Sequence, residues 1–85
     1  MPEVEIGTVV HYFDRPQVAV VRIAAGEIAI GDTLRFHGHT TEFSETVGSM
    51  EVDHQSVARA GVGAEVAIKV VGRARVHDKV FKVTA

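Results

Sequence analysis

Apolar and polar residues alternate along much of the chain, and this period predicts strands. The cleanest alternation spans residues 33–37, where Leu34 and Phe36 share one face and polar residues occupy the other. Residues 65–71 follow the same pattern, with Val66, Ile68 and Val70 on one face. Both segments are therefore predicted to be half-buried β-strands.

Further short apolar runs predict more strands, separated by turn-forming residues. These runs are residues 6–13, 18–23, 28–30, 40–43, 45–53 and 80–83. Residues 18–23 are apolar at nearly every position, which predicts burial on both faces. Residues 14–17 contain a proline, which cannot donate to a ladder, and are predicted to be a hairpin connection. Residues 57–60 before Gly61 predict one helical turn that ends at a left-handed glycine.

Composition supports an all-β fold. Val occurs sixteen times and Leu once, and β-branched side chains fit a pleated sheet better than a helix. A length of 85 residues predicts one domain, residues 1–85. Six or seven short strands are typical of a small barrel or sandwich, and a closed barrel is favoured because closure removes exposed strand edges.

Several classes of protein are excluded or disfavoured by what the sequence lacks. It has no cysteine, which excludes disulfides and thiolate metal sites and suits a reducing cytosol. No apolar run approaches the roughly 18 residues of a membrane span. The acidic N-terminal residues do not resemble a signal peptide. We therefore expect a cytoplasmic protein that does not contact a membrane.

Two segments share one order of residue types. Residues 30–34 and 76–80 each read apolar, turn residue, Asp, polar, apolar. An aspartate can accept a hydrogen bond from its own backbone nearby and so fix the turn into a strand. The similarity is either an internal repeat or two similar turns in one barrel.

The chain resembles the β-barrel second domain of translational GTPases such as elongation factors Tu and 1-alpha. The matching segments are residues 7–10, 20–23, 26–34, 49–54 and 57–70, and together they extend over nearly the whole chain. Residues 38–43 (Gly-His-Thr-Thr-Glu-Phe) resemble small stand-alone proteins that consist of this barrel alone. A similar barrel occurs in collagenase-like peptidases that act partly as RNA-modification enzymes. The resemblance implies a six-stranded antiparallel Greek-key β-barrel.

The resemblance does not bring GTP chemistry with it. No phosphate-binding loop is present, so we expect no nucleotide, and no cofactor of another kind is indicated. The sequence departs from the family at His77-Asp78, where Gly-Asp is usual. If this position needs a positive φ, histidine adopts it less readily than glycine, at a cost of about 1 kcal/mol.

The histidines and serines suggest two further hypotheses, a metal site and a hydrolase. His37 and His39 lie on one face if extended, and His11 or His54 could complete a metal site; the alternative is that they are structural or surface residues. No nucleophile elbow surrounds a serine. The neighbours Asp53 and His54 would point to opposite faces of a strand, so we predict no catalytic residues.

Charge divides the chain unequally. Residues 1–58 carry a net −6 and residues 59–85 a net +4. The residues predicted to bind nucleic acid are Lys69, Arg73, Arg75 and Lys82. Candidates for base stacking are Tyr12, Phe13 and Phe43, although core packing is commoner for Phe. The alternative is a solvated surface of mixed charge, and the pI of about 6.2 argues against strong non-specific binding.

The leading functional prediction is a non-catalytic binding module that contacts tRNA, ribosomal RNA or the translation machinery, as the resemblance implies. The alternative is a protein-interaction module associated with a collagenase-like peptidase or an RNA-modification enzyme. A small enzyme is the third hypothesis. A basic patch beside exposed aromatics would favour RNA, whereas an exposed apolar patch would favour a protein partner.

Overall fold

The structure, a computed structural model, describes residues 2–84, and within this range it consists of β-strands and connections without a helix. The strands are β1 Glu3–Asp14, β2 Gln17–Ile23, β3 Glu27–Ala29, β4 Thr33–His37, β5 Glu42–Thr46, β6 Met50–Val52, β7 Gln55–Ser56, β8 Arg59–Gly61, β9 Glu65–Lys69 and β10 Lys79–Val83. The all-β prediction is confirmed. Residues 2–84 accordingly hold no helix long and apolar enough to cross a membrane.

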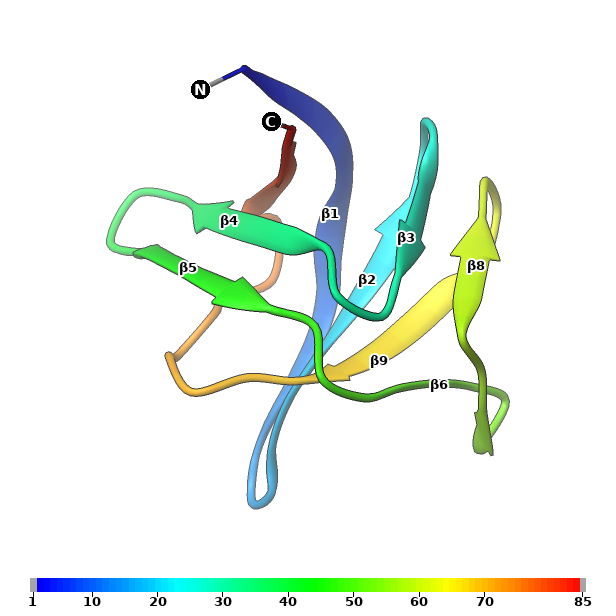
Figure 1. Cartoon of the computed structure of the whole chain (residues 1–85). Helices are drawn as coiled ribbons and strands as arrows, with labels where there is room; N and C mark the ends of the chain where they lie inside the picture. The colour runs from blue at the N-terminus through cyan, green and yellow to red at the C-terminus, as the bar shows by residue number, and fades with distance from the viewer. Residues whose placement is uncertain (1, 85) are drawn as a thin grey trace.

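All strand pairs are antiparallel. Eight strands form one sheet in the order β5-β4-β10-β1-β2-β9-β6-β7, and β3 pairs with β8 in a second, two-stranded sheet (Figure 1). The long β1 lies at the middle of the larger sheet and pairs with β10 and β2. Among the described residues no ladder joins the end strands β5 and β7. A six-stranded Greek-key barrel is therefore not confirmed, and closure stays a prediction.

The core is built from the strand faces that the alternation predicted. Leu34 and Phe36 on β4 and Val66 on β9 have no exposed surface. The full buried apolar set is Ile6, Val9, Ala19, Val21, Ile23, Ile28, Leu34, Phe36, Val47, Met50, Val66, Ile68, Val70, Ala74 and Val80. This core fixes which face of each strand points inward, because slipping the register by one residue would expose it.

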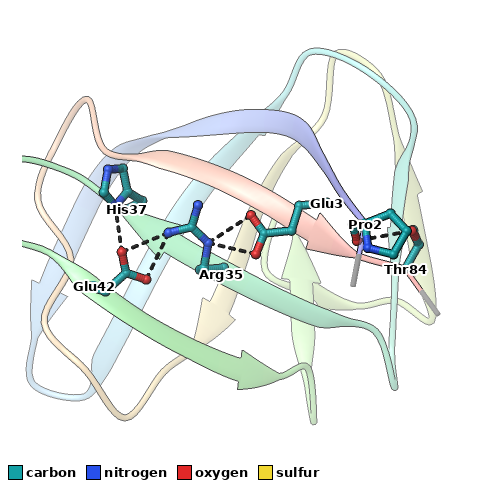
Figure 2. Close-up of polar contacts among 6 residues, drawn as sticks. All are labelled: Pro2, Glu3, Arg35, His37, Glu42 and Thr84. Carbon is teal, nitrogen blue, oxygen red and sulfur yellow. Dashed lines mark hydrogen bonds and ion pairs between the residues drawn. The ribbon is translucent and has the colours of Figure 1, made fainter.

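The termini lie side by side. The backbone N–H of Thr84 donates to the carbonyl oxygen of Pro2 at 2.9 Å, and the Thr84 hydroxyl donates to the same oxygen at 3.3 Å (Figure 2). These contacts extend the β1–β10 pairing to both ends of the described chain.

The predicted strand over residues 45–53 is wrong in its extent. It is divided into β5 and β6 because Val47, between them, turns inward and exchanges backbone hydrogen bonds with the β3–β4 turn. Gly31 donates to the Val47 carbonyl and Val47 donates to the Asp32 carbonyl, both at 2.8 Å. Asp53 and His54 then form the two-residue turn between β6 and β7, with φ of 52° and 64°. Two positive φ values in a row are typical of a type I′ hairpin turn.

The predicted helical turn before Gly61 is also wrong. Residues 59–61 are strand β8, and Ala60 packs against the core from its pairing with Ile28 of β3. The left-handed glycine of this region is Gly63, with φ of 91°. Pairing with β3 overrides the local signal, because it satisfies the backbone groups that a single isolated turn would leave to water.

The two similar sequence segments form the same turn. In each, the residue before the aspartate has a positive φ: 97° at Gly31 and 79° at His77. In each, an aspartate Oδ2 accepts the N–H three residues earlier, Ala29 at 2.8 Å for Asp32 and Arg75 at 2.7 Å for Asp78. The backbone N–H of each aspartate returns a bond to the same residue at 3.0 Å. His77 thus occupies a position with positive φ, where glycine is preferred, and this meets the condition under which the sequence predicted a cost for histidine.

Candidate functional site

The basic residues predicted from the sequence do not continue one strand face. Strand β9 ends at Lys69, and the described chain from 70 to 78 contains no strand. The alternation that would align Lys69 with Arg73 and Arg75 therefore stops at Lys69. Lys82 lies on β10, separated from β9 by β1 and β2 in the sheet.

Two of these basic residues already have acidic partners. Lys82 Nζ lies 3.1 Å from Asp32 Oδ2 and donates to the Glu27 carbonyl oxygen at 3.3 Å. Its side chain is only 25% exposed, so it ties β10 to the β3–β4 region. Arg73 Nη1 lies 3.9 Å from Asp14 Oδ1, a loose and exposed pair. Lys69 and Arg75 pair with no carboxylate of residues 2–84.

The predicted stacking aromatics separate into buried and exposed side chains. Phe43 stacks on Phe36, with ring centroids 4.8 Å apart, and packs against the core. Tyr12 is partly buried, and its hydroxyl donates to the Gly72 carbonyl oxygen at 3.5 Å. Phe13 remains 48% exposed. Its ring packs edge-to-face with the ring of His11, and the two ring centroids lie 4.3 Å apart. Only Phe13 of the three offers much of its ring to a partner.

The histidines that suggested a metal site are not gathered. Within residues 2–84 no group of three or more His, Cys, Asp or Glu side chains is placed to hold a metal ion. His37 Nδ1 instead lies 2.7 Å from Glu42 Oε1. His39 is exposed in the turn between β4 and β5.

A cluster of charged side chains crosses the surface of β1, β4 and β5. Arg35 lies between two carboxylates, with Nε 2.9 Å from Glu3 Oε2 and Nη1 2.8 Å from Glu42 Oε1 (Figure 2). Its guanidinium also lies over the Phe81 ring of β10, 4.8 Å from the centroid. His37 contacts the far side of Glu42.

These contacts shift two pKa values. Hydrogen bonds to Glu42 and Glu3 raise the pKa of Arg35, and hydrogen bonds with His37 and Arg35 lower the pKa of Glu42. Because solvent screens such exposed pairs, the energetic gain is modest. The cluster spans four neighbouring strands of the sheet, β1, β10, β4 and β5. It holds these strands together, and its partners are all satisfied within the chain.

An apolar groove lies on the outer face of β2, β9 and β6, and we call it the outer groove. Its floor is Val18 and Val20 of β2 with Ala67 of β9. Val20 and Ala67 have buried neighbours on both sides, and Val18 precedes the buried Ala19. Cross-strand pairing aligns Val20, Ala67 and Glu51 in one row, and Val18 with Lys69 in the next. The outer groove is defined by these five residues, Val18, Val20, Glu51, Ala67 and Lys69.

The outer groove contains two adjoining hollows that share Glu51 and Ala67. One has a volume of about 290 Å³ and is lined by Pro16, Val18, Ser49, Met50, Glu51, Ala67 and Lys69. The other has a volume of about 270 Å³ and is lined by Phe13, Val20, Glu51, Asp53, His54, Glu65 and Ala67. The side chain of Ala67 is smaller than those of its neighbours, so the surface is hollowed above it.

The two ends of the outer groove differ in charge. Lys69 lies at one end, and Glu51, Asp53 and Glu65 line the hollow at the other. Arg22 neutralises Glu65, with its Nε donating to Oε2 at 3.0 Å. Within the described chain Glu51 and Asp53 have no cationic partner. The second hollow therefore presents two free carboxylates beside an apolar floor.

Sequence reasoning did not identify this site, and of its five defining residues it singled out only Lys69, as a nucleic-acid contact. The continuous apolar run at residues 18–23 predicted burial on both faces, but the structure leaves the outer face of Val18 and Val20 only half-buried. That run was the available signal for a surface that needs a partner. Ala67 and Glu51 carried no signal, because their importance comes from the pairing of β9 with β2 and β6.

The chain is similar to one part of larger proteins that are named as proteases or collagenases. It is 34% identical over 80 residues to an uncharacterized protease of Methanocaldococcus jannaschii, and this alignment covers 93% of this chain and 19% of that protein. It is 31% identical over 81 residues to a collagenase of Porphyromonas gingivalis, covering 94% of this chain and 20% of the collagenase. The chain thus spans about a fifth of the length of these curated relatives. No protein-family model matches it.

Solved structures share the fold. The C-terminal domain of a proposed U32 peptidase of Geobacillus thermoleovorans superimposes with a TM-score of 0.86 at 18% identity, covering 95% of this chain and 93% of that domain. The selenomethionine variant of the same domain gives a TM-score of 0.76 at 16% identity, covering 93% and 98%.

These matches correct the predicted family. The resemblance to domain 2 of elongation factors is wrong as an assignment, because the relatives are named as proteases and collagenases and the structural match is a peptidase domain. The prediction of a translation-type, RNA-binding protein depended on that resemblance and is corrected with it. Phosphate contacts at Lys69, Arg73, Arg75 and Lys82 stay a prediction from charge alone.

Proposed function

We propose that this chain is a non-catalytic protein-interaction domain that associates with the catalytic part of a collagenase-like peptidase. The observation that carries the proposal is the length of the match. Between 91% and 94% of the chain aligns with only 19–22% of proteins named protease or collagenase. A segment of that size, with the fold of a domain solved on its own, is typical of an accessory domain.

The absence of an assembled catalytic group within residues 2–84 supports a non-catalytic role. Ser44, Ser49 and Ser56 are exposed, and none of their hydroxyls has a histidine partner in the described chain. Asp53 and His54, adjacent in sequence, form a turn in which both have positive φ. A nucleophile, its base and an orienting group within hydrogen-bond reach are what catalysis of peptide cleavage would need.

The binding test uses the Methanocaldococcus jannaschii protease with its 80-residue matched segment deleted. We expect this chain to bind the deleted protease saturably, with a Kd of roughly 10 μM or tighter, by isothermal titration calorimetry. The intact protease is the matched control, because its own segment would already occupy the docking surface. It should bind the chain at least roughly tenfold more weakly, which corresponds to about 1.4 kcal/mol.

The deleted protease is first checked for cooperative thermal unfolding, so that a misfolded partner is recognised. A folded deleted protease that does not bind the chain would overturn the proposed function. Equal binding to the intact and the deleted proteins would also count against it, because the chain would then not be using the surface that the matched segment covers.

A further inference from the structure

We propose that the outer groove is where this domain receives its partner, and that the occupant is an extended protein segment with an apolar side chain two residues from a Lys or Arg, so that both face the groove. This inference rests on the proposed function for the identity of the partner. It deepens that function by naming the surface and the chemistry of the segment that binds there.

The floor of the outer groove is the first argument. The solvent side of an antiparallel sheet is ordinarily polar. Here the outward positions of β2 and β9 that meet at the centre are Val18, Val20 and Ala67, all half-buried. Two valines beside an alanine leave a shallow apolar depression rather than a flat surface, and its two hollows measure about 290 and 270 Å³. An aliphatic or proline side chain can enter such a depression over Ala67.

Exposed apolar surface continues to one side of the outer groove. In the register of β1 with β2, His11 lies opposite Val20 and Phe13 lies opposite Val18. Phe13 is 48% exposed and lines the second hollow. The row of His11, Val20, Ala67 and Glu51 therefore crosses four strands, from an aromatic ring through an apolar floor to a carboxylate. A ring next to a small apolar floor is a common anchor site in interfaces.

Charge selects the occupant. Glu51 and Asp53 line one hollow without a cation from residues 2–84. A Lys or Arg placed two residues beyond the apolar side chain would lie on the same face of the extended segment and would meet these carboxylates. Arginine suits the site better, because its fork can bond two carboxylate oxygens at once. Lys69, at the opposite end, would repel a second cation there and so fix the direction in which the segment lies.

The backbone at the acidic end is held in an uncommon conformation. Asp53 and His54 have φ of 52° and 64°, where non-glycine residues are uncommon. An Asn-Gly pair would form the same turn with less strain, but it would remove the Asp53 carboxylate from the rim of the hollow. The strained turn thus presents a charge at the place where the proposed occupant needs one.

The first experiment probes the outer groove without any protease. The ¹⁵N-labelled chain is titrated with the peptide acetyl-Thr-Val-Thr-Arg-Thr-amide, whose Val and Arg share one face when extended, and with its matched counterpart, in which Glu replaces Arg. We expect the Arg peptide to shift the amide resonances of Val20, Glu51 and Ala67 with a Kd on the order of 1 mM. The Glu peptide should bind at least about fivefold more weakly. Equal binding of both peptides, or shifts confined to other strands, would overturn the proposal.

The second experiment returns to the deleted protease. Glu51→Lys and Ala67→Gln should each weaken binding by roughly tenfold or more, the first by charge reversal and the second by filling the depression. Glu5→Lys on β1 makes the same change of charge outside the outer groove, and Val62→Gln replaces an apolar residue that is 67% exposed and lines neither hollow. Both controls should bind like the wild type.

The outcomes separate the inference from the proposed function. If the wild type binds the deleted protease and the groove variants bind equally well, the inference is wrong and the proposed function survives. If the wild type does not bind but the Arg peptide shifts the groove resonances selectively, the groove assignment survives and its partner is not this protease. Circular dichroism of each variant shows that the fold is intact, since Ala67 and Glu51 face outward.

Discussion

Exchanging the residues of the two equivalent turns gives a direct measure of backbone strain. Gly31 and His77 precede Asp32 and Asp78 in the same geometry, with φ of 97° and 79°. A left-handed φ costs an L-residue roughly 1–2 kcal/mol, and glycine loses about 0.5–1 kcal/mol more conformational entropy on folding. The difference predicts that His77→Gly stabilises the protein by about 0.5–1 kcal/mol.

Replacing His77 with glycine changes the backbone strain without removing a hydrogen bond of the described chain. The His77 side chain is exposed and takes part in no hydrogen bond within the described chain. The bond that its backbone N–H donates to the Val9 carbonyl, at 2.8 Å, is one that glycine also makes. At the equivalent position, a Cβ built on Gly31 would meet no atom within 4 Å. Gly31→His is therefore a control in which strain changes and packing does not, and it should destabilise by a similar amount.

The assay is thermal unfolding followed by far-ultraviolet circular dichroism, with urea unfolding at 25 °C as a check. A change of 1 kcal/mol shifts the midpoint of a domain this size by about 4–8 °C, so His77→Gly should raise it by about 2–8 °C. Gly31→His should lower it by a comparable amount. If His77→Gly lowered the midpoint, or if Gly31→His left it unchanged, the assignment of strain to these two positions would be refuted.

Three further predictions concern single side chains. Glu42 has a pKa below its ordinary value of 4.5 in the folded state, so it should contribute stability above about pH 4.5 that is lost as pH falls through the folded pKa. As the pH is lowered from 6 to 3, the urea midpoint should therefore fall less steeply for Glu42→Gln than for the wild type. Parallel curves for the two proteins would contradict this. Thr41 is 3% exposed and its Oγ1 lacks a partner within residues 2–84, so Thr41→Val should be neutral or stabilise by up to about 1 kcal/mol, whereas a loss of that size would reveal a missing hydrogen bond. Phe36 is fully buried and stacks on Phe43, so Phe36→Ala should cost about 3–5 kcal/mol by urea unfolding, and Phe43→Ala, at a half-buried ring, should cost less.

Local pattern predicted the strands whose inward face is set by alternation. Leu34 and Phe36 are buried as expected, and so are Val66 and Ile68, because period-two burial is a property of the strand itself. The two misassigned segments depend on distant residues. Val47 leaves the strand pattern to bond Gly31 and Asp32, and Ala60 becomes strand through Ile28. The local sequence around Val47 and Ala60 contains no pattern that predicts either contact.

The candidate site could be predicted even less than the fold. The run of apolar residues on β2 was visible, but its half-buried outer face depends on what β9 places beside it. A basic C-terminal region was also visible, but the pairing of its Lys82 with Asp32 across the fold was not. The net charge of a sequence segment does not predict a charged surface, because the pairing of the strands determines which carboxylates lie near which cations.

The mistaken family assignment has a physical cause in the residues that carried it. The matched segments are dominated by turn chemistry, such as Gly31-Asp32, and by apolar strand residues such as Val66 and Ile68. Asp32 accepts the Ala29 N–H and so specifies a turn, and the strand residues specify a core. Residues of both kinds specify a fold and not a function, so proteins with unrelated functions can share them. The residues that would distinguish a peptidase partner from any other, Glu51, Ala67 and Lys69 on the outer groove, are the ones about which a turn motif says nothing. A test of function must therefore change those outward residues and leave the turns intact.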